Sequence, residues 1–127
     1  MSKAEQIERW IQALQESIPE VRGVMVAASD GLPIAHSFPS EEAARVAAMS
    51  ATALGLGRRI SETSRLDELQ EVVIRGAGGS LVIYRTGPRA VMAVAVPQGA
   101  NLGLLHLEAR EVARKIAALL EEGREEA

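Results

Sequence analysis

Few side chains in this chain of 127 residues have the types and spacing that catalysis or metal binding requires. There is no cysteine, which excludes thiolate nucleophiles and Cys-ligated zinc or iron–sulfur centres. The two histidines, His36 and His106, lie far apart and have no carboxylate partner at metal-ligand spacing. No Gly-x-Ser-x-Gly motif marks a serine nucleophile. The sequence therefore predicts no catalytic centre, no metal site and no cofactor.

Two motifs could instead contact phosphate groups. Arg58 and Arg59 are adjacent, and an arginine finger stabilises the charge that develops in phosphoryl transfer. Two arginines near the C-terminal end of a helix are also favourable with the helix dipole alone. The glycine run 76–79 lies between two predicted strands, whereas a dinucleotide-binding fingerprint needs a helix after its glycines. We therefore interpret the run as a hairpin turn.

Composition limits the class of protein. A hydrophobic content of 47% supports a folded chain, and 127 residues suit one domain. Only 2% of the residues are aromatic and the net charge is −3, which disfavours stacking on single-stranded nucleic acid and binding to phosphate backbones. The N-terminus has no apolar signal segment, and Pro97 interrupts the longest uncharged stretch. We expect one cytoplasmic domain over residues 1–127, with a frayed charged tail from about residue 121 and without nucleic-acid or membrane partners.

Three segments have the pattern of amphipathic helices. Each starts with a residue that can cap a helix, after which apolar residues recur at helical spacing. The predicted helices are 2–18, 40–63 and 102–120, and their predicted N-caps are Ser2, Ser40 and Asn101. Ser2 and Glu5 also have the spacing of a capping box.

Five segments are predicted strands, over residues 21–28, 32–37, 71–75, 81–85 and 90–96. The first and the last of them have apolar runs without alternation, which is typical of strands covered on both faces of a sheet. We therefore expect these two to be central neighbours with helices above and below. The sequence Ser29-Asp30-Gly31 predicts a tight turn, and Pro33 predicts that the second strand lies at an edge, since proline donates no backbone hydrogen bond.

The helix over residues 40–63 is unusually rich in alanine, serine and glycine. Gly55 and Gly57 lie in its interior, where each glycine costs about 1 kcal/mol relative to alanine. This composition predicts that another element approaches the helix closely. In the strand 71–75, the opposite charges of Glu71 and Arg75 would attract across an antiparallel pair of identical strands. We therefore predict a two-fold dimer, with a monomer that has an ordinary sheet edge as the alternative.

The predicted dimer interface combines this helix and this strand. Its candidate residues are Val46, Ala47, Ser50, Ala51, Leu54 and Gly57 in the helix and Glu71, Val72, Val73, Ile74 and Arg75 in the strand.

The sequence resembles the roadblock/dynein light chain family. The most specific part is Gly99-Ala100-Asn101-Leu102-Gly103-Leu104-Leu105, followed in the helix by Glu108-Ala109-Arg110. Supporting motifs are Gly23-Val24-Met25-Val26, Ser29-Asp30-Gly31-Leu32-Pro33-Ile34-Ala35 and Leu56-Gly57-Arg58-Arg59. The resemblance covers nearly the whole chain. It implies a profilin-like α+β sandwich with a five-stranded antiparallel sheet in the order 2-1-5-4-3, one helix on one face and the two terminal helices on the other.

The resemblance also implies a function. Members of the family form homodimers through the third strand and the second helix, and they act as scaffolds or as regulators of small Ras-like GTPases. We therefore expect a non-catalytic homodimeric regulator that binds such a GTPase and could modulate its GTP hydrolysis, with Glu42, Arg45, Arg58 and Arg59 as candidate contacts. The alternatives are a small-molecule-sensing α/β domain and a dimerisation scaffold without GTPase contact.

Overall fold

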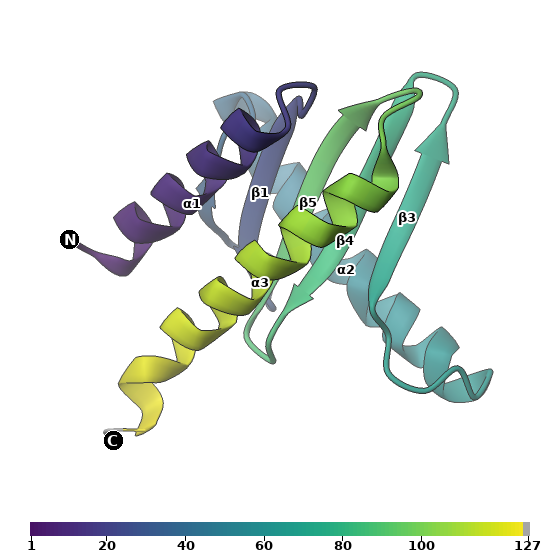
Figure 1. Cartoon of the computed structure of the whole chain (residues 1–127). Coiled ribbons are helices and arrows are strands. Elements are labelled where there is room, and N and C mark those ends of the chain that lie inside the picture. The colour runs from purple at the N-terminus through teal and green to yellow at the C-terminus, as the bar shows by residue number, and fades with distance from the viewer. Residues whose placement is uncertain (126–127) are drawn as a thin grey trace.

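A computed structural model of the chain describes residues 1–125 (Figure 1). The elements are α1 (Lys3–Ser17), β1 (Gly23–Ala28), β2 (Pro33–His36), α2 (Ser40–Thr63), β3 (Glu71–Gly76), β4 (Gly79–Thr86), β5 (Ala90–Pro97) and α3 (Leu102–Glu125). The five strands form one antiparallel sheet in the order β2-β1-β5-β4-β3. This confirms the element order and the strand order expected from the sequence.

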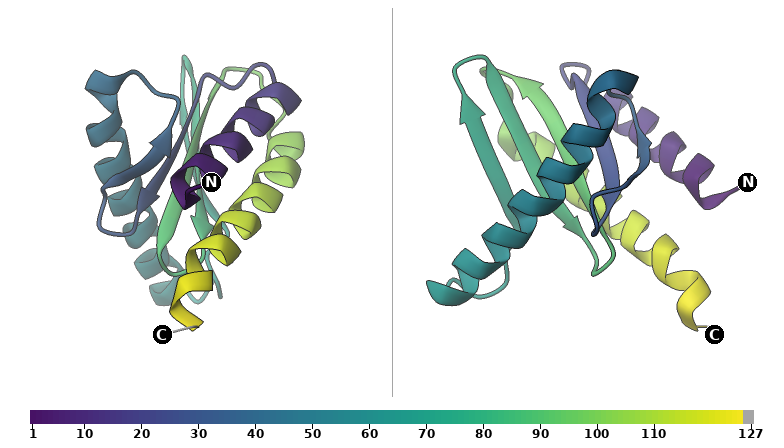
Figure 2. Two further views of the ribbon diagram at one scale, coloured as in Figure 1. Left: turned by 90° about the vertical axis from the view of Figure 1, so that its left-hand side faces the viewer. Right: turned by 180° about the vertical axis from the view of Figure 1, so that it is seen from behind.

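The molecule has three layers, with the sheet in the middle. Helix α2 alone covers one face of the sheet, and α1 and α3 lie side by side on the other face (Figure 2). Each side has its own apolar core. One core joins α1 and α3 to the sheet through residues such as Ile7, Ile116 and Val94, and the other joins α2 to the sheet through residues such as Leu54 and Ile83.

The central position of β1 and β5 follows from their apolar side chains. The two strands pair directly, with Val24 opposite Val94 and Met25 opposite Ala93. These four side chains are fully buried, because successive residues of a strand point to opposite faces and both faces are covered here. The prediction of two central neighbours is confirmed.

The turn between β1 and β2 needs the residues that the sequence places there. The Asp30 side chain accepts a hydrogen bond from the backbone N–H of Leu32 at 3.2 Å, which is the local role predicted for an aspartate in a turn. Gly31 has a φ of +92°, and a Cβ at this position would lie 3.2 Å from the Cα of Ala48. Pro33 begins β2 at the edge of the sheet, as predicted.

The glycine run is a hairpin turn, as interpreted from the sequence. β3 and β4 pair up to Gly76 and Gly79, and Ala77 and Gly78 connect them. Gly79 has a φ of +150°, and a Cβ there would lie 2.5 Å from the carbonyl oxygen of Val96 in β5. The close approach of β5 therefore explains this glycine without any phosphate ligand.

Two of the three predicted helix caps are confirmed. Ser2 accepts a hydrogen bond from the N–H of Glu5, whose carboxylate accepts one from the N–H of Ser2. Asn101 accepts one from the N–H of Leu104 at 3.0 Å. Ser40 is not a cap. It lies inside α2 as the first residue, and the cap position is Pro39, which has no side-chain hydrogen bond.

The capping box also affects the ionisation of Glu5. The backbone N–H and the side chain of Ser2 hold the pKa of the Glu5 carboxyl below its ordinary value. Since these hydrogen bonds favour the charged carboxylate, their contribution to stability is present above the ordinary pKa and is lost as the pH falls through the pKa of the folded protein.

Helix α3 extends to Glu125, so the first residues of the predicted frayed tail are helical. The last two residues of that tail lie outside the described residues. Within residues 1–125, no helix has both the length and the apolar character that a membrane span requires.

Helix α2 lies close to the sheet at small residues. Ala43 and Ala47 are buried against the core that contains Ala27 and Ala93 of the two central strands. At the other end of the helix, a Cβ on Gly57 would lie 2.8 Å from the Cγ2 of Val72 in β3. The predicted close approach to Gly57 therefore comes from the chain's own β3.

The two serines that precede or begin helices test the cap assignment. We expect Ser2→Ala to lower the free energy of unfolding by about 1 kcal/mol, because it removes the acceptor of a helix N-terminal N–H. Ser40→Ala should change it by less than about 0.5 kcal/mol, as for a surface substitution without such a bond. Urea denaturation followed by circular dichroism measures both. Equal losses for the two variants would contradict the assignment.

The two glycines inside α2 form a second matched pair. A Cβ added at Gly55 would meet no atom within 4 Å, so Gly55→Ala should raise the free energy of unfolding by about 1 kcal/mol through helix propensity. Gly57→Ala should give no such gain, since its methyl group would overlap Val72. Denaturation of the two variants side by side gives the difference, and equal gains would show that α2 does not contact β3 at Gly57.

Candidate interaction surface

The inner face of α2 packs on the sheet. Its buried residues are Ala43, Ala47, Ser50, Leu54 and Ser61, which recur at helical spacing. Ala47 and Leu54 contact the core formed with β1, β4 and β5. This face is therefore already covered in a single copy of the chain.

Several predicted interface residues need correction for that reason. Ala47, Ser50 and Leu54 are at most 1% exposed, so a second copy cannot contact their side chains. Gly57 is packed against Val72 of the same chain. The sequence signal was the abundance of small residues, and it does not distinguish a helix that packs on its own sheet from one that packs on a second helix. Val46 is half-buried at the margin of this core.

Ala51 is also half-buried at the margin of this core. Together with Val46, it stays a candidate interface residue.

One lateral side of α2 faces the uncovered part of the sheet near β3. Gly57, which contacts Val72, marks this side, and residues three or four positions apart lie on the same side of a helix. The β3-facing side of α2 comprises Val46, Met49, Ala53 and Ile60. Met49 is 61% exposed and Ile60 is 51% exposed. Their spacing from Gly57 is the sequence signal that could have identified them as interface candidates.

Strand β3 is the free edge of the sheet on this side of the molecule. Val72 points toward α2, and the alternation of a strand places Ile74 on the same face of the sheet. Ile74 is 51% exposed and Val73, on the opposite face, is 39% exposed. The predicted edge position of this strand is confirmed, and its apolar side chains continue the β3-facing side of α2. In Figure 2, the C-terminal end of α2 lies at the edge of the sheet that β3 forms.

The other face of β3 is joined to α3 by polar contacts. Glu71 forms an ion pair with Arg110 of α3, and the hydrogen bond between them raises the pKa of the arginine. Glu71 lies opposite Tyr84 of β4. The Tyr84 hydroxyl lies 2.7 Å from Nδ1 of His106 in α3, with the two rings edge to face at 77°. Arg75, the other charged residue predicted to attract a second copy, is exposed.

Tyr84 stays protonated over the physiological range. Burial raises the pKa of its hydroxyl, and the nearby negative charge of Glu71 adds to the effect. The hydroxyl and the Nδ1 atom of His106 share one hydrogen bond, and the tautomer of the imidazole decides which of the two donates. This arrangement holds α3, β4 and β3 together at one corner of the sheet, and His106 has a structural partner here.

The predicted partner contacts divide between two sides of α2. Glu42, Arg45 and Arg59 are exposed. Arg45 and Arg59 belong to an outward stripe of the helix, which also contains Thr52 and Leu56, at spacings of seven, four and three residues along the chain.

Arg58 does not belong to this outward stripe. It is half-buried and lines a hollow with Ser61 and Arg85, and its Nε has no hydrogen-bond partner. Of the two arginines in the arginine-finger hypothesis, Arg59 is exposed and Arg58 is half-buried.

The titratable side chains of the described residues do not form a metal centre. Among residues 1–122, whose side chains the structure describes, no group of three His, Cys, Asp or Glu residues could hold a metal ion. His36 lies on β2 at one edge of the sheet, and its half-buried ring has an Nδ1 without a partner. His106 lies on α3, so the fold does not bring the two imidazoles together.

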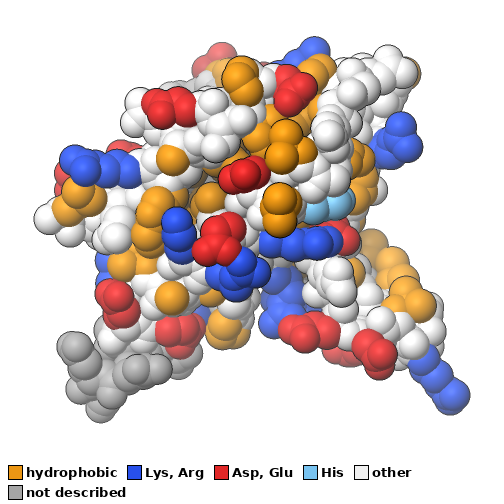
Figure 3. All heavy atoms as spheres, in the orientation of Figure 1, with side chains coloured by type: hydrophobic (Ala, Val, Ile, Leu, Met, Phe, Trp, Pro, Cys, Tyr) orange, Lys and Arg blue, Asp and Glu red, His pale blue; other side chains and the backbone are white. Residues whose placement is uncertain are grey.

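Charge is mixed on the face of the molecule that carries α1 and α3. Basic and acidic side chains alternate there and apolar ones lie between them (Figure 3). The described side chains of this face form no extended surface of a single charge. The apolar surface of α2 and β3 therefore remains the candidate interaction surface.

Comparison with known proteins agrees with this geometry. A family model described as Roadblock/LC7 domain matches residues 10–95. An uncharacterized protein of Methanocaldococcus jannaschii, MJ0714, is 33% identical over 100 residues, which cover 78% of this chain and 84% of that protein. A second uncharacterized protein of the same organism, MJ1340, is 31% identical over 100 residues, which cover 78% of this chain and 87% of that protein.

A solved structure has the same fold. MglB of Myxococcus xanthus superimposes with a TM-score of 0.83 at 17% identity, covering 95% of this chain and 92% of that one. At this identity the similarity shows the fold alone. The family-model match and the sequence relatives go further, and together they establish that this chain belongs to the Roadblock/LC7 family.

Proposed function

We propose that this protein is a homodimeric scaffold that binds a small Ras-like GTPase and regulates its nucleotide cycle. The observation that carries the proposal is the exposed apolar surface formed by the β3-facing side of α2 and the free edge of β3. Regulators of this kind are what the family resemblance implies. The proposal has two steps, the formation of the dimer and the contact with the GTPase.

The dimer step rests on the state of β3. An unpaired strand presents free backbone N–H and C=O groups, and an exposed apolar edge promotes unspecific association unless it is blocked or paired. Ile74, Met49 and Ile60 are large apolar side chains that are half exposed or more in one copy. A second copy that adds its β3 to this edge pairs the strand and covers these side chains at once.

Charge selects the register of this pairing. In an antiparallel pair of identical strands centred on Val73, Glu71 faces Arg75 of the partner subunit. Glu71 already holds Arg110, and a carboxylate has enough acceptor positions for a second arginine. The opposite charges therefore favour this register over its neighbours, which lack the pairing.

The GTPase step rests on the outward stripe of α2. In the proposed dimer, two copies of this stripe lie close together on the same side of the ten-stranded sheet. Each stripe has Leu56 at its centre, 58% exposed, with Arg45 and Arg59 one or more turns away. An apolar centre with a basic rim suits a partner that presents an apolar patch with an acidic rim.

We expect substitutions at β3 to dissociate the dimer. Ile74→Asp should give monomers, because it places a charge in an apolar interface. Arg75→Glu should weaken the dimer by about tenfold or more, because it faces Glu71 of the partner subunit with a like charge, and tenfold corresponds to about 1.4 kcal/mol. Sedimentation velocity measures the association.

Arg9→Glu, an exposed change on α1 with the same change in charge, is the control for the dimer experiment and should leave the dimer intact. Circular dichroism shows whether each variant is folded. A wild-type protein that sediments as a monomer at all concentrations would refute the dimer step.

The contact with a GTPase can be tested with small GTPases from the same cells. The wild-type protein should associate with at least one of them in a nucleotide-dependent way, when the GTPase is loaded with GDP or with a non-hydrolysable GTP analogue. Arg45→Glu and Arg59→Glu should each weaken this association by about tenfold, since both reverse a charge on the outward stripe. Biolayer interferometry and the rate of GTP hydrolysis are the measurements.

Arg9→Glu is again the matched control, because it lies on the opposite face of the sheet. Both stripe variants should sediment as dimers, which separates the loss of partner binding from the loss of the dimer. A dimer that binds none of the GTPases in either nucleotide state would leave a dimerisation scaffold without GTPase contact.

A further inference from the structure

A hollow of about 320 Å³ lies at the C-terminal end of α2, between this helix, the loop before β3 and Arg85 of β4. Arg58 of α2 lines the hollow and is half-buried, and its Nε atom is buried without a hydrogen-bond partner. Among the side chains that the structure describes, Arg58 takes part in no ion pair. A partly buried guanidinium without an acceptor costs free energy, which indicates that the acceptor comes from another molecule.

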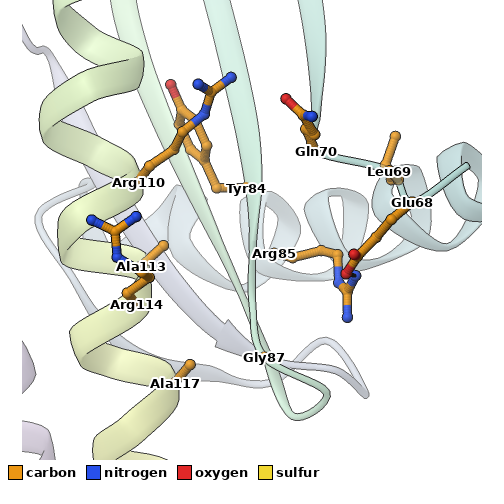
Figure 4. A pocket seen from close by; sticks show the side chains of 10 residues that line it. All are labelled: Glu68, Leu69, Gln70, Tyr84, Arg85, Gly87, Arg110, Ala113, Arg114 and Ala117. Carbon is orange, nitrogen blue, oxygen red and sulfur yellow. Dashed lines mark hydrogen bonds and ion pairs between the residues drawn. The ribbon is translucent and has the colours of Figure 1, made fainter.

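The other arginine of the hollow has an internal partner. Arg85 forms an ion pair with Glu68 of the loop. Figure 4 shows these two side chains beside each other and apart from Arg110 and Arg114 of α3. Arg58 is therefore the arginine of this hollow that remains for a ligand.

A glycine lies beside Arg58 on the surface of α2. Gly55 is three residues before Arg58 and four before Arg59, so all three lie on one side of the helix. A glycine inside a helix costs free energy relative to alanine. The φ of Gly55 is not positive, and a Cβ at this position would meet no atom within 4 Å. Neither the backbone nor the packing of the chain itself therefore explains a glycine here.

The open space at Gly55 suits a close approach from outside. A residue without a Cβ lets the backbone of another molecule come nearer to the helix. The hydroxyl of Thr52, one turn before Gly55, donates to the backbone carbonyl of Ala48 at 2.9 Å and so is satisfied within α2. Figure 2 shows α2 as the one described helix on its face of the sheet. Gly55 and the unpaired Arg58 are thus two separate features that fit the same external partner.

The charges around the hollow favour a carboxylate as the group that Arg58 binds. A carboxylate is planar and can accept two parallel hydrogen bonds from a guanidinium. Glu62 and Asp67 also line the hollow and are exposed, so they repel each negative charge of a ligand. A carboxylate has one such charge, whereas a phosphate group has about 1.5 to 2. The space at Gly55 further requires a polypeptide segment, since a small free anion would not fill it.

We propose that this site recognises an acidic side chain on a loop of the GTPase. The backbone of the loop lies against Gly55, and its aspartate or glutamate carboxylate enters the hollow and accepts hydrogen bonds from Arg58. Arg59, on the outward stripe, adds positive charge at the rim. This inference rests on the proposed function, and it specifies the chemical group that α2 recognises in its partner.

The variant Gly55→Ala separates a role in binding from a role in folding. We expect it to unfold at a higher urea concentration than the wild type, since alanine favours the helix. It should nevertheless bind the GTPase at least about tenfold more weakly, since its methyl group holds the loop away. Biolayer interferometry with the GTPase that the wild-type dimer binds measures the affinity. Gly103→Ala, the same change at an exposed position of α3, is the control and should leave the affinity unchanged.

Arg58 is tested by removing its charge and by a cross-link. Arg58→Gln should weaken binding by about tenfold, whereas Arg9→Gln, at an exposed position of α1, should not. In Arg58→Lys, a carbodiimide should condense the new amine with an aspartate or glutamate of the GTPase into an amide. Mass spectrometry of the digested complex identifies the two joined residues. The native lysines, Lys3 on α1 and Lys115 on α3, should give no such cross-link.

The outcomes distinguish this inference from the proposed function. A wild-type dimer that binds no GTPase contradicts both. Binding that is weakened by Arg59→Glu but unchanged by Gly55→Ala or by Arg58→Gln overturns this inference alone, as does a cross-link restricted to the native lysines. A Gly55 or Arg58 variant that sediments as a monomer would assign its residue to the dimer and would equally overturn the inference.

Discussion

The close packing of α2 on the sheet is the constraint on which the other features depend. Alanines of the helix meet alanines of the two central strands, Ala27 and Ala93, so the helix axis can lie close to the sheet. Larger side chains at these positions are poorly tolerated, because protein cores are packed to crystal-like density and respond to single methyl groups. The inner face of α2 is thereby committed to the chain's own core. Larger apolar residues, such as Met49 and Ile60, are left for the lateral side toward β3.

This constraint explains which parts of the fold could be predicted from sequence. The central place of β1 and β5 follows from strands without polar alternation, and the turn at Asp30 and Gly31 follows from local backbone chemistry. These features depend on neighbouring residues alone. The capping residue of α2 could not be identified in this way, since both Pro39 and Ser40 precede acidic residues and only the backbone path decides which of them lies outside the helix.

The sequence also could not show which face of α2 packs on the sheet. Alanine, serine and glycine occur on most sides of this helix, so the contrast between an apolar and a polar face is weak. The small-residue pattern assigns Ala47 and Leu54 to a second copy, although they serve the chain's own core. Arg58 and Arg59 are adjacent in sequence, yet adjacent helical residues point about 100° apart. The hollow that Arg58, Ser61 and Arg85 line had no signal in the sequence, because its residues come from α2, from the loop after it and from β4.

The buried corner of Tyr84 and His106 gives the edge strand a fixed position. β3 is half exposed and gains little from apolar burial, so its place depends on the ladder with β4 and on its polar contacts with α3. The Tyr84 hydroxyl is buried and has His106 as its partner, and the loss of that partner would leave an unsatisfied polar group in the core. The hydrogen bond therefore holds α3 at the distance from β4 at which Arg110 can reach Glu71. An edge strand that pairs in one register needs its charged side chains in fixed positions. In this chain, the hydrogen bond between Tyr84 and His106, on the face of the sheet that α3 covers, fixes those positions.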